Sequence, residues 1–245
     1  MHILVTRPET EAPRTTRKLE AMGHRVTIAP LLRILTEAPA LDTSGVQAIV
    51  LTSRNSVHAL RNHRQLASLQ RLPVISVGRS TGEAAREAGF TVALEGDAGG
   101  AELAPLIARH FAPEAGSLLH ISGEAVAFDL VSALAPHGFT MQRAIVYRSV
   151  PIEHLPGDVT SALRDGTLDA VLLMSPRTSQ VWCDLVEASG LSNEARSLAH
   201  LCLSQGVAAA LNRLGPPALK IAVKPNEEQT LALAASLSSS SADKS

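Results

Sequence analysis

The sequence predicts an α/β fold made of two lobes, each with a parallel sheet flanked by helices. Short apolar runs such as His2–Thr6 and Ala48–Ser53 are typical of buried strands, and a segment of helical length follows each of them. Strands that alternate with helices in this way form parallel sheets with helices on both faces. About ten or eleven strands are expected, which suits two small sheets better than one. The run at 141–149 lies between two segments that repeat the same order of strand and helix, so it predicts a crossover between the lobes.

The first lobe is expected to contain both ends of the chain, residues 1–35 and 150–235. Thr6, with Glu9 three residues later, is typical of a helix start, and Gly23 ends that helix. The strands expected here are 2–6, 25–29, the extended run 31–35, 168–174, 199–203 and 220–223. The helices expected after the crossover are 158–164, 176–189, 206–213 and 226–235.

The second lobe is expected to span residues 37–147. Ser53 has the character of an N-cap for helix 54–61, and Gly89 ends helix 81–88. The other elements expected here are strands 47–52, 73–77, 91–94, 117–122 and 141–149, and helices 101–110 and 125–136. The serine-rich end of the chain, 236–245, is too polar to pack and is expected to be disordered.

Composition excludes several classes of protein. The formal net charge of −1 argues against a nucleic-acid-binding surface. The two cysteines, Cys183 and Cys202, have no partner motif, which fits a reducing cytosol better than a disulfide scaffold. No apolar run approaches the roughly 18 residues of a membrane span. The sequence therefore predicts a cytoplasmic protein that needs no membrane.

Hydroxyl side chains recur where the expected strands end and helices begin. In a parallel sheet such turns share one edge, and helix N-termini there favour anions. Each turn taken alone also fits an ordinary N-cap, but five of them with interspersed arginines indicate a site for a polyanion. The candidate binding residues in these turns are Thr6, Arg7, Pro8, Thr52, Ser53, Asn55, Gly78, Thr81, Ser122, Gly123, Ser175, Pro176, Arg177 and Thr178.

Other kinds of site lack their signatures. The sequence has no dinucleotide fingerprint, no phosphate loop, no convincing metal-ligand spacing and no serine-hydrolase elbow. The expected site therefore works without a metal or an obvious nucleophile. Tyr147, the only tyrosine, lies in the crossover strand; a packed side chain and a ligand-binding side chain are both open for it.

Four segments together resemble uroporphyrinogen-III synthase: Val5–Pro8, Ile49–Val57, Ser76–Thr81 and Val146–Arg148. The resemblance covers roughly residues 1–235, and the order and spacing of the motifs carry it. It implies two α/β lobes joined by a two-stranded connection. It also implies the reaction, in which hydroxymethylbilane, a linear tetrapyrrole with carboxylate arms, closes to uroporphyrinogen III with inversion of ring D and loss of water.

The resemblance also implies roles for particular residues. Tyr147 would assist departure of the hydroxyl, Thr81 would be a further polar contact, and no cofactor is needed. The chain departs from the family pattern at Ser204–Val207, where a threonine turn is common, so Ser204 is the candidate substitute there. A second departure is Phe128, which stands where an arginine is common. A monomer is expected.

Two other classes of function remain open. A two-lobed protein could bind a small anion without catalysing a reaction. A glycosyl- or nucleotide-transferring enzyme would need paired carboxylates or a metal-binding aspartate at a strand end, and the sequence shows neither.

Overall fold

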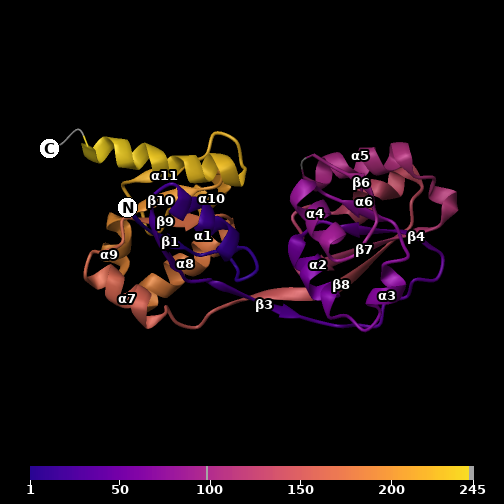
Figure 1. Cartoon of the computed structure of the whole chain (residues 1–245), viewed down its shortest axis with the longest axis horizontal. Helices are drawn as coiled ribbons and strands as arrows, with labels where there is room; N and C mark the ends of the chain where they lie inside the picture. Colours follow the sequence, from indigo (N-terminus) through magenta and orange to yellow (C-terminus); the bar gives the residue numbers. More distant parts are fainter. Residues whose placement is uncertain (98, 243–245) are drawn as a thin grey trace. The chain divides into compact units, whose positions relative to one another are not determined.

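The computed structural model describes residues 1–97 and 99–242, with side chains up to residue 237. The chain divides into two compact units, shown in Figure 1. The first unit contains Met1–Arg33 and Val150–Ser245, and the second unit contains Ile34–Ser149.

The first unit is built on a five-stranded parallel sheet with the order β11-β10-β9-β1-β2. Its strands are β1 (His2–Val5), β2 (Arg25–Ile28), β9 (Ala170–Leu173), β10 (Ala199–Cys202) and β11 (Leu219–Ile221). Its helices are α1 (Ala12–Ala21), α7 (Gly157–Arg164), α8 (Pro176–Ala188), α9 (Ser192–Ser197), α10 (Gln205–Ala209) and α11 (Glu227–Ala242).

Both faces of this sheet are buried. Successive strand residues point to opposite faces, so neighbouring residues of one strand pack in different cores. Leu4 of β1 packs with Trp182 of α8 in one core, whereas its neighbours Ile3 and Val5 pack with Leu19 of α1 in the other. Helices α7 to α10 therefore cover one face, and α1 with α11 covers the other. Because helices cover both faces, every residue of a central strand is buried, and this explains the continuous apolar runs in the sequence.

The second unit contains a six-stranded sheet with the order β3-β8-β7-β4-β5-β6. Its strands are β3 (Leu32–Thr36), β4 (Val46–Leu51), β5 (Val74–Ser76), β6 (Val92–Glu95), β7 (Ser117–Gly123) and β8 (Met141–Pro151). Its α-helices are α2 (Arg54–Arg61), α3 (Leu66–Leu69), α4 (Arg79–Glu87), α5 (Gly100–His110) and α6 (Leu130–Leu134). Helices α2 to α4 pack on one face of the sheet, and α5 with α6 packs on the other.

Two strands carry the chain between the units. Strand β3 leaves the first unit and β8 returns to it. Glu37 N donates to Val146 O at 2.7 Å, and Ile152 N donates to Leu31 O at 3.1 Å, so the residue numbers run in opposite directions along the pair. This is an antiparallel two-stranded connection. The predicted α/β class with parallel sheets is confirmed, and so is the two-stranded connection.

The structure corrects two helix starts. The first helix begins at Ala12 rather than after Thr6, because the Thr6 hydroxyl donates to Leu172 O at 2.7 Å and does not cap a helix. Helix 125–136 is shortened to α6, because the Asp129 carboxylate accepts from Ser132 N and sets the start there. The four residues 125–128 are therefore a loop, which matters for the site described below.

The end of the chain also differs from the expectation. Helix α11 continues to Ala242, so residues 236–242 are helical rather than disordered, and 243–245 lie outside the described residues. Serine is only a weak helix breaker, and the Ser236 hydroxyl donates to Leu233 O within the helix at 2.7 Å. The short helices α3 and α9, which the sequence analysis did not predict, fill the connections 62–71 and 190–198.

Candidate functional site

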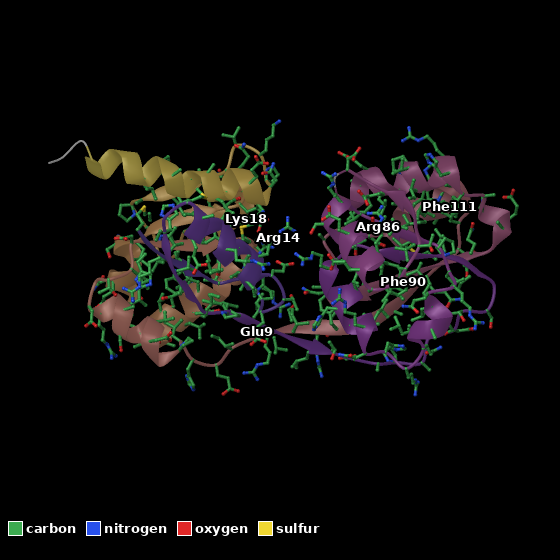
Figure 2. All side chains as sticks on the ribbon, viewed as in Figure 1. Glu9, Arg14, Lys18, Arg86, Phe90 and Phe111 are labelled. Carbon is green, nitrogen blue, oxygen red and sulfur yellow. The ribbon has the colours of Figure 1, made fainter. Side chains whose placement is uncertain are left out.

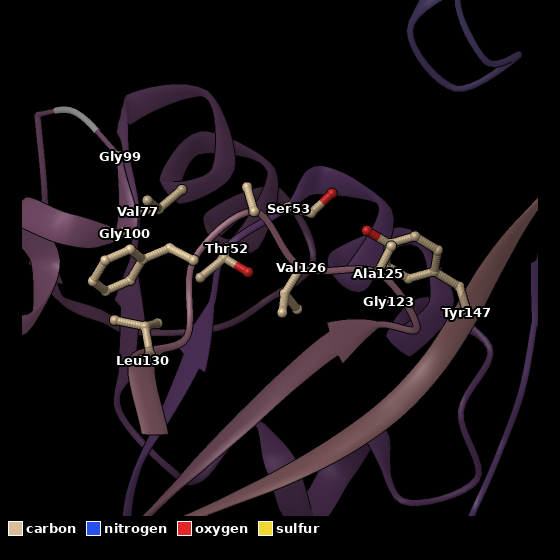
Figure 3. Close-up of a pocket in the computed structure, with 12 residues that line it drawn as sticks. Thr52, Ser53, Val77, Gly99, Gly100, Gly123, Ala125, Val126, Leu130 and Tyr147 are labelled. Carbon is tan, nitrogen blue, oxygen red and sulfur yellow. The ribbon is translucent and has the colours of Figure 1, made fainter. Parts of the chain in front are cut away.

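The second unit contains a pocket of about 380 Å³ where its parallel strands end (Figure 3). The turns after β4 and β5, the end of β7, the start of α5 and the middle of β8 all contribute to it. Its lining residues are Thr52, Ser53, Val77, Gly99, Gly100, Gly123, Ala125, Val126, Ala127, Phe128, Leu130 and Tyr147. The carboxyl edge of a parallel sheet is the usual place for a ligand in this class of fold.

One wall of the pocket is the turn from β4 into α2. Ser53 is extended and its hydroxyl accepts from Asn55 N at 3.1 Å, which caps the helix as predicted. The remaining N–H groups of the first turn and the helix dipole favour a negative group at this end. Figure 3 shows the phenol of Tyr147 extending from β8 toward the turn that carries Ser53.

A buried histidine stands behind this wall. Nε2 of His120 lies 3.0 Å from the Thr52 hydroxyl oxygen, and the side chain is only 2% exposed. Burial, with the nearby charge of Arg143 as a smaller cause, lowers the pKa of His120 to about 4. The imidazole is therefore neutral at physiological pH, and it orients the Thr52 hydroxyl without adding charge to the pocket.

Tyr147, which is 9% exposed, also lines the pocket. Gly123 faces it across β7 and β8, and Glu124 N donates to Tyr147 O at 2.9 Å. A Cβ atom at residue 123 would lie 2.5 Å from Cζ and 2.8 Å from the phenol oxygen of Tyr147. The ring therefore packs directly on the glycine backbone, and only glycine leaves room for it.

The structure brings four predicted residues into this pocket: Thr52, Ser53, Gly123 and Tyr147. The other predicted residues of the unit do not line it. Gly78 is the N-cap of α4, Thr81 is buried in the first turn of that helix, and Asn55 is buried in α2. Ser122 is 1% exposed, and its hydroxyl donates to Gly123 O and accepts from Arg143 Nε.

The apolar part of the pocket was missed from the sequence. Residues 125–128 were expected in a helix, and as a loop they form the rim that includes Val126 and Phe128. Phe128 packs against the start of α5, where a Cβ at Gly100 would meet Phe128 Cβ at 2.9 Å. The pair Gly99-Gly100 was the available signal, because consecutive glycines before a helix often permit close packing.

In the first unit the predicted residues also lie at the carboxyl edge of the sheet. Ser175 caps α8 by accepting from Thr178 N at 3.1 Å, and the two hydroxyl groups lie 2.7 Å apart. Pro176 occupies the first turn of that helix, and Arg177 follows it. Ser204 caps α10 by accepting from Val207 N at 3.4 Å. Together with Thr6 and Pro8 after β1, these residues form a row of strand-end turns along three neighbouring strands, β10, β9 and β1.

Arg7 does not take part in this row as a substrate-facing cation. Its guanidinium forms ion pairs with Glu11 and with Glu227, the latter at 2.8 Å. Lys18 and Arg14 of α1, labelled in Figure 2, also contact the Glu227 carboxylate, at 2.5 and 3.7 Å. Burial alone would raise the pKa of Glu227, but hydrogen bonds from Lys18 and Thr15 and the charges of Arg7 and Lys18 outweigh it and lower this pKa. Arg7 therefore ties the start of α11 to α1.

Within 1–97 and 99–242, no three histidine, cysteine or carboxylate side chains gather as metal ligands. No helix in this part of the chain combines the length and apolar character needed to cross a membrane.

A sequence model of the family described as uroporphyrinogen-III synthase HemD matches residues 13–232. A uroporphyrinogen-III synthase of Chlorobaculum parvum is 27% identical over 225 residues, which cover 87% of this chain and 89% of that protein.

Solved structures give the same fold. The uroporphyrinogen-III synthetase of Helicobacter pylori aligns with a TM-score of 0.67 and 22% identity, over 96% of this chain and 99% of that one. A mutant synthase from Thermus thermophilus aligns with a TM-score of 0.55 and 17% identity, over 98% and 99% of the two chains. The chain belongs to the uroporphyrinogen-III synthase family, the lyases that cyclise hydroxymethylbilane in tetrapyrrole biosynthesis.

Proposed function

We propose that this chain closes hydroxymethylbilane to uroporphyrinogen III, with inversion of ring D and loss of water, and that Tyr147 assists the departure of the hydroxyl. The observation that supports this most strongly is the position of the phenol in the pocket of the second unit. It is the one phenol in the chain, and it lines a pocket at strand ends together with the hydroxyls of Thr52 and Ser53.

The pocket is suited to the reacting end of the substrate rather than to all of it. Its volume of about 380 Å³ lies at the low end of the range of ligand pockets, roughly 300–1,000 Å³. Val77, Val126 and Phe128 offer apolar surface for a pyrrole ring. The N-terminus of α2 offers N–H groups to a carboxylate arm.

The chemistry begins when the C–O bond of the hydroxymethyl group breaks. The phenol of Tyr147 transfers its proton to the departing oxygen, which leaves as water, and the proton that the bilane releases when the ring finally closes restores the phenol. The azafulvene cation that remains is attacked by the substituted carbon of ring D, which gives a spiro intermediate. This intermediate fragments and closes again with ring D inverted. The protein contributes mainly by holding the two ends of the bilane in the geometry that favours this attack.

The remaining predicted residues have a supporting role in this proposal. Thr52 and Ser53 bind the substrate in the second unit, where Gly123 leaves room for the phenol. In the first unit, Ser204 and the turn Ser175–Thr178 offer helix N-terminal N–H groups that suit a carboxylate. Thr6, whose hydroxyl is bonded to Leu172 O, and Pro8 are assigned to the shape of the turn after β1. Gly78, Thr81, Asn55 and Ser122 support the turns, and Arg7 is assigned to the packing of α11.

We propose that the reaction needs no cofactor or metal, and that the chain acts as a monomer in the cytoplasm. The two buried free cysteines support a reducing compartment. Light scattering coupled to gel filtration tests the oligomeric state: a mass near 25.8 kDa is expected, and twice that mass would contradict it.

The activity is tested with hydroxymethylbilane generated in the assay from porphobilinogen by its deaminase. The bilane closes by itself to the type I isomer, so the products are oxidised and the porphyrin isomers are separated. A predominance of type III is expected with this chain present. Only type I, from folded protein that still binds the bilane, would favour a binding protein without catalysis.

A further inference from the structure

Arg143 of β8 binds the end of the neighbouring strand β7 with three hydrogen bonds. Its Nε donates to the Ser122 hydroxyl at 2.8 Å, and its Nη2 donates to the carbonyl oxygens of Gly123 and Glu124 at 2.6 and 2.5 Å. These carbonyls belong to the point where β7 stops pairing regularly with β8, since the register shifts between Ser122 and Gly123. Arg143 thus stabilises an irregular strand end, where the regular hydrogen bonds between β7 and β8 stop.

The same strand end determines where the phenol lies. Gly123 faces Tyr147 across the two strands, and the ring packs on the Gly123 backbone. Glu124 N donates to Tyr147 O, while Glu124 O accepts from Arg143. The residues that follow, 125–128, form the rim of the pocket. A shift of this strand end would therefore move the surface beneath the phenol and the rim beside it.

We propose that Arg143 is a positioning residue for Tyr147, acting through Ser122, Gly123 and Glu124. This inference rests on the proposed function, because the role of the phenol is part of that proposal. Arginine suits the task because its planar fork carries several donors in fixed directions, whereas lysine is a single flexible point charge. Arg143 does not line the pocket, and its Nε and Nη2 are already engaged by the strand end. Direct binding of a substrate carboxylate is therefore not its main role.

The test compares Arg143→Gln, Arg143→Lys and the matched control Arg61→Gln. Arg61 is a half-exposed arginine of the same unit whose ion pair with Glu87 lies away from the pocket. Both Arg143 variants are expected to lose about 10- to 100-fold in kcat for type III product with little change in KM, and the control is expected to keep wild-type values. Full recovery by lysine would overturn the proposal, because charge alone would then suffice.

A second readout does not depend on turnover. With 3-fluorotyrosine incorporated, the protein gives a single ¹⁹F signal, because Tyr147 is its only tyrosine. The signal is expected to shift or broaden in both Arg143 variants and to stay unchanged in Arg61→Gln. An unchanged signal in folded Arg143→Gln would overturn the positioning role. If wild-type protein makes no type III isomer, the proposed function fails, and the fluorine signal still decides whether Arg143 positions the phenol.

A double-mutant cycle identifies the route of the effect. In a Tyr147→Phe background, Arg143→Gln should cause much less further loss than in the wild type, because the hydroxyl that it positions is already absent. An equal fold-loss in both backgrounds would contradict the proposal. If the Arg143 variants do not fold, Ser122→Ala removes the acceptor of Nε together with the hydrogen bond from Ser122 to Gly123 O, and leaves both Nη2 hydrogen bonds in place. It should shift the fluorine signal in the same direction by a smaller amount. No shift in that variant would count against the proposal.

Discussion

The ring of Tyr147 packs on the bare backbone of Gly123, and a Cβ atom at residue 123 would come within 2.5 Å of Cζ and 2.6 Å of Cε2. The two residues face each other across β7 and β8, where the register of the pair is irregular. The glycine is needed here because of close approach and not because of its backbone angles, since its φ lies outside the left-handed region. The position of the phenol is thus set by a residue on another strand.

Gly123→Ala is expected to displace the phenol and to lower kcat for type III product by about 10- to 100-fold. The ring is largely enclosed, so it cannot move aside without disturbing the pocket wall. The measurement is the rate and isomer composition of the product together with thermal unfolding. Gly157→Ala is the matched control, because nothing lies within 4 Å of a Cβ there, and it should leave both properties unchanged. Wild-type kinetics in Gly123→Ala would refute the steric argument.

His200 makes the stability of the first unit depend on pH. Trp182 Nε1 donates to His200 Nε2 at 3.3 Å, so the ring proton must sit on Nδ1, which lies 3.0 Å from Leu198 O. A second proton on Nε2 would face the indole N–H. Burial lowers the pKa of His200 to about 4, partly offset by the hydrogen bond to Leu198.

Because the pKa of His200 is lower in the folded state than in the unfolded state, the protein loses stability as the pH falls. Above pH 6.5 both the folded and unfolded states hold His200 neutral; below it the unfolded state gains a proton first, so stability falls until about pH 4. His200 should cost about 2 kcal/mol of unfolding free energy between pH 7 and pH 5. Denaturant titrations at the two pH values, followed by the fluorescence of Trp182, measure this. The loss should shrink by that amount in His200→Gln and persist in the exposed-site control His58→Gln; the same pH dependence in both variants would refute it.

Glu227 is expected to hold α11 against α1 through its contacts with three cations. Glu227→Gln leaves the largely buried Arg7 with less compensation, so the unfolding free energy should fall by roughly 1–3 kcal/mol. The pKa of Glu227 is lowered in the folded state. Its contribution to the unfolding free energy is therefore present above the pKa of the unfolded state and is lost as the pH falls through the pKa of the folded state. Hydrogen exchange of α11 and denaturant titrations at pH 7 and pH 3.5 measure the loss of stability and its dependence on pH. The neighbouring exposed residue gives the control Glu228→Gln, and equal stability of the two variants at pH 7 would contradict the assignment.

The fold was predictable from the sequence because its signals are local. Apolar runs such as Ala48–Leu51 mark strands buried on both faces, and Ser53 caps α2 where the sequence places it. The ion pair of Arg7 with Glu227 was not predictable, because Glu227 lies 220 residues further along the chain. An arginine next to a strand end indicates an anion site, and only the tertiary structure shows that a carboxylate of the protein already occupies it.

The site was predictable only in part for the same reason. Thr52, Ser53 and Tyr147 carry recognisable polar groups at strand ends or in the crossover strand. The rim 125–128 was hidden because its sequence favours a helix, and the cap formed by Asp129 decides otherwise. The role of Gly123 as a packing surface depends on its register with β8, which the sequence does not reveal.

The central claim is that the Tyr147 phenol assists loss of the hydroxyl from hydroxymethylbilane, and Tyr147→Phe tests it most directly. The variant keeps the ring that packs on Gly123, so the fold and the binding of the bilane should be retained. The measurement is the rate of type III formation against the spontaneous type I background, with circular dichroism to confirm folding. The account predicts a loss of about 10²- to 10⁴-fold in turnover, the usual contribution of a general acid. Turnover and type III yield equal to those of the wild type would contradict it.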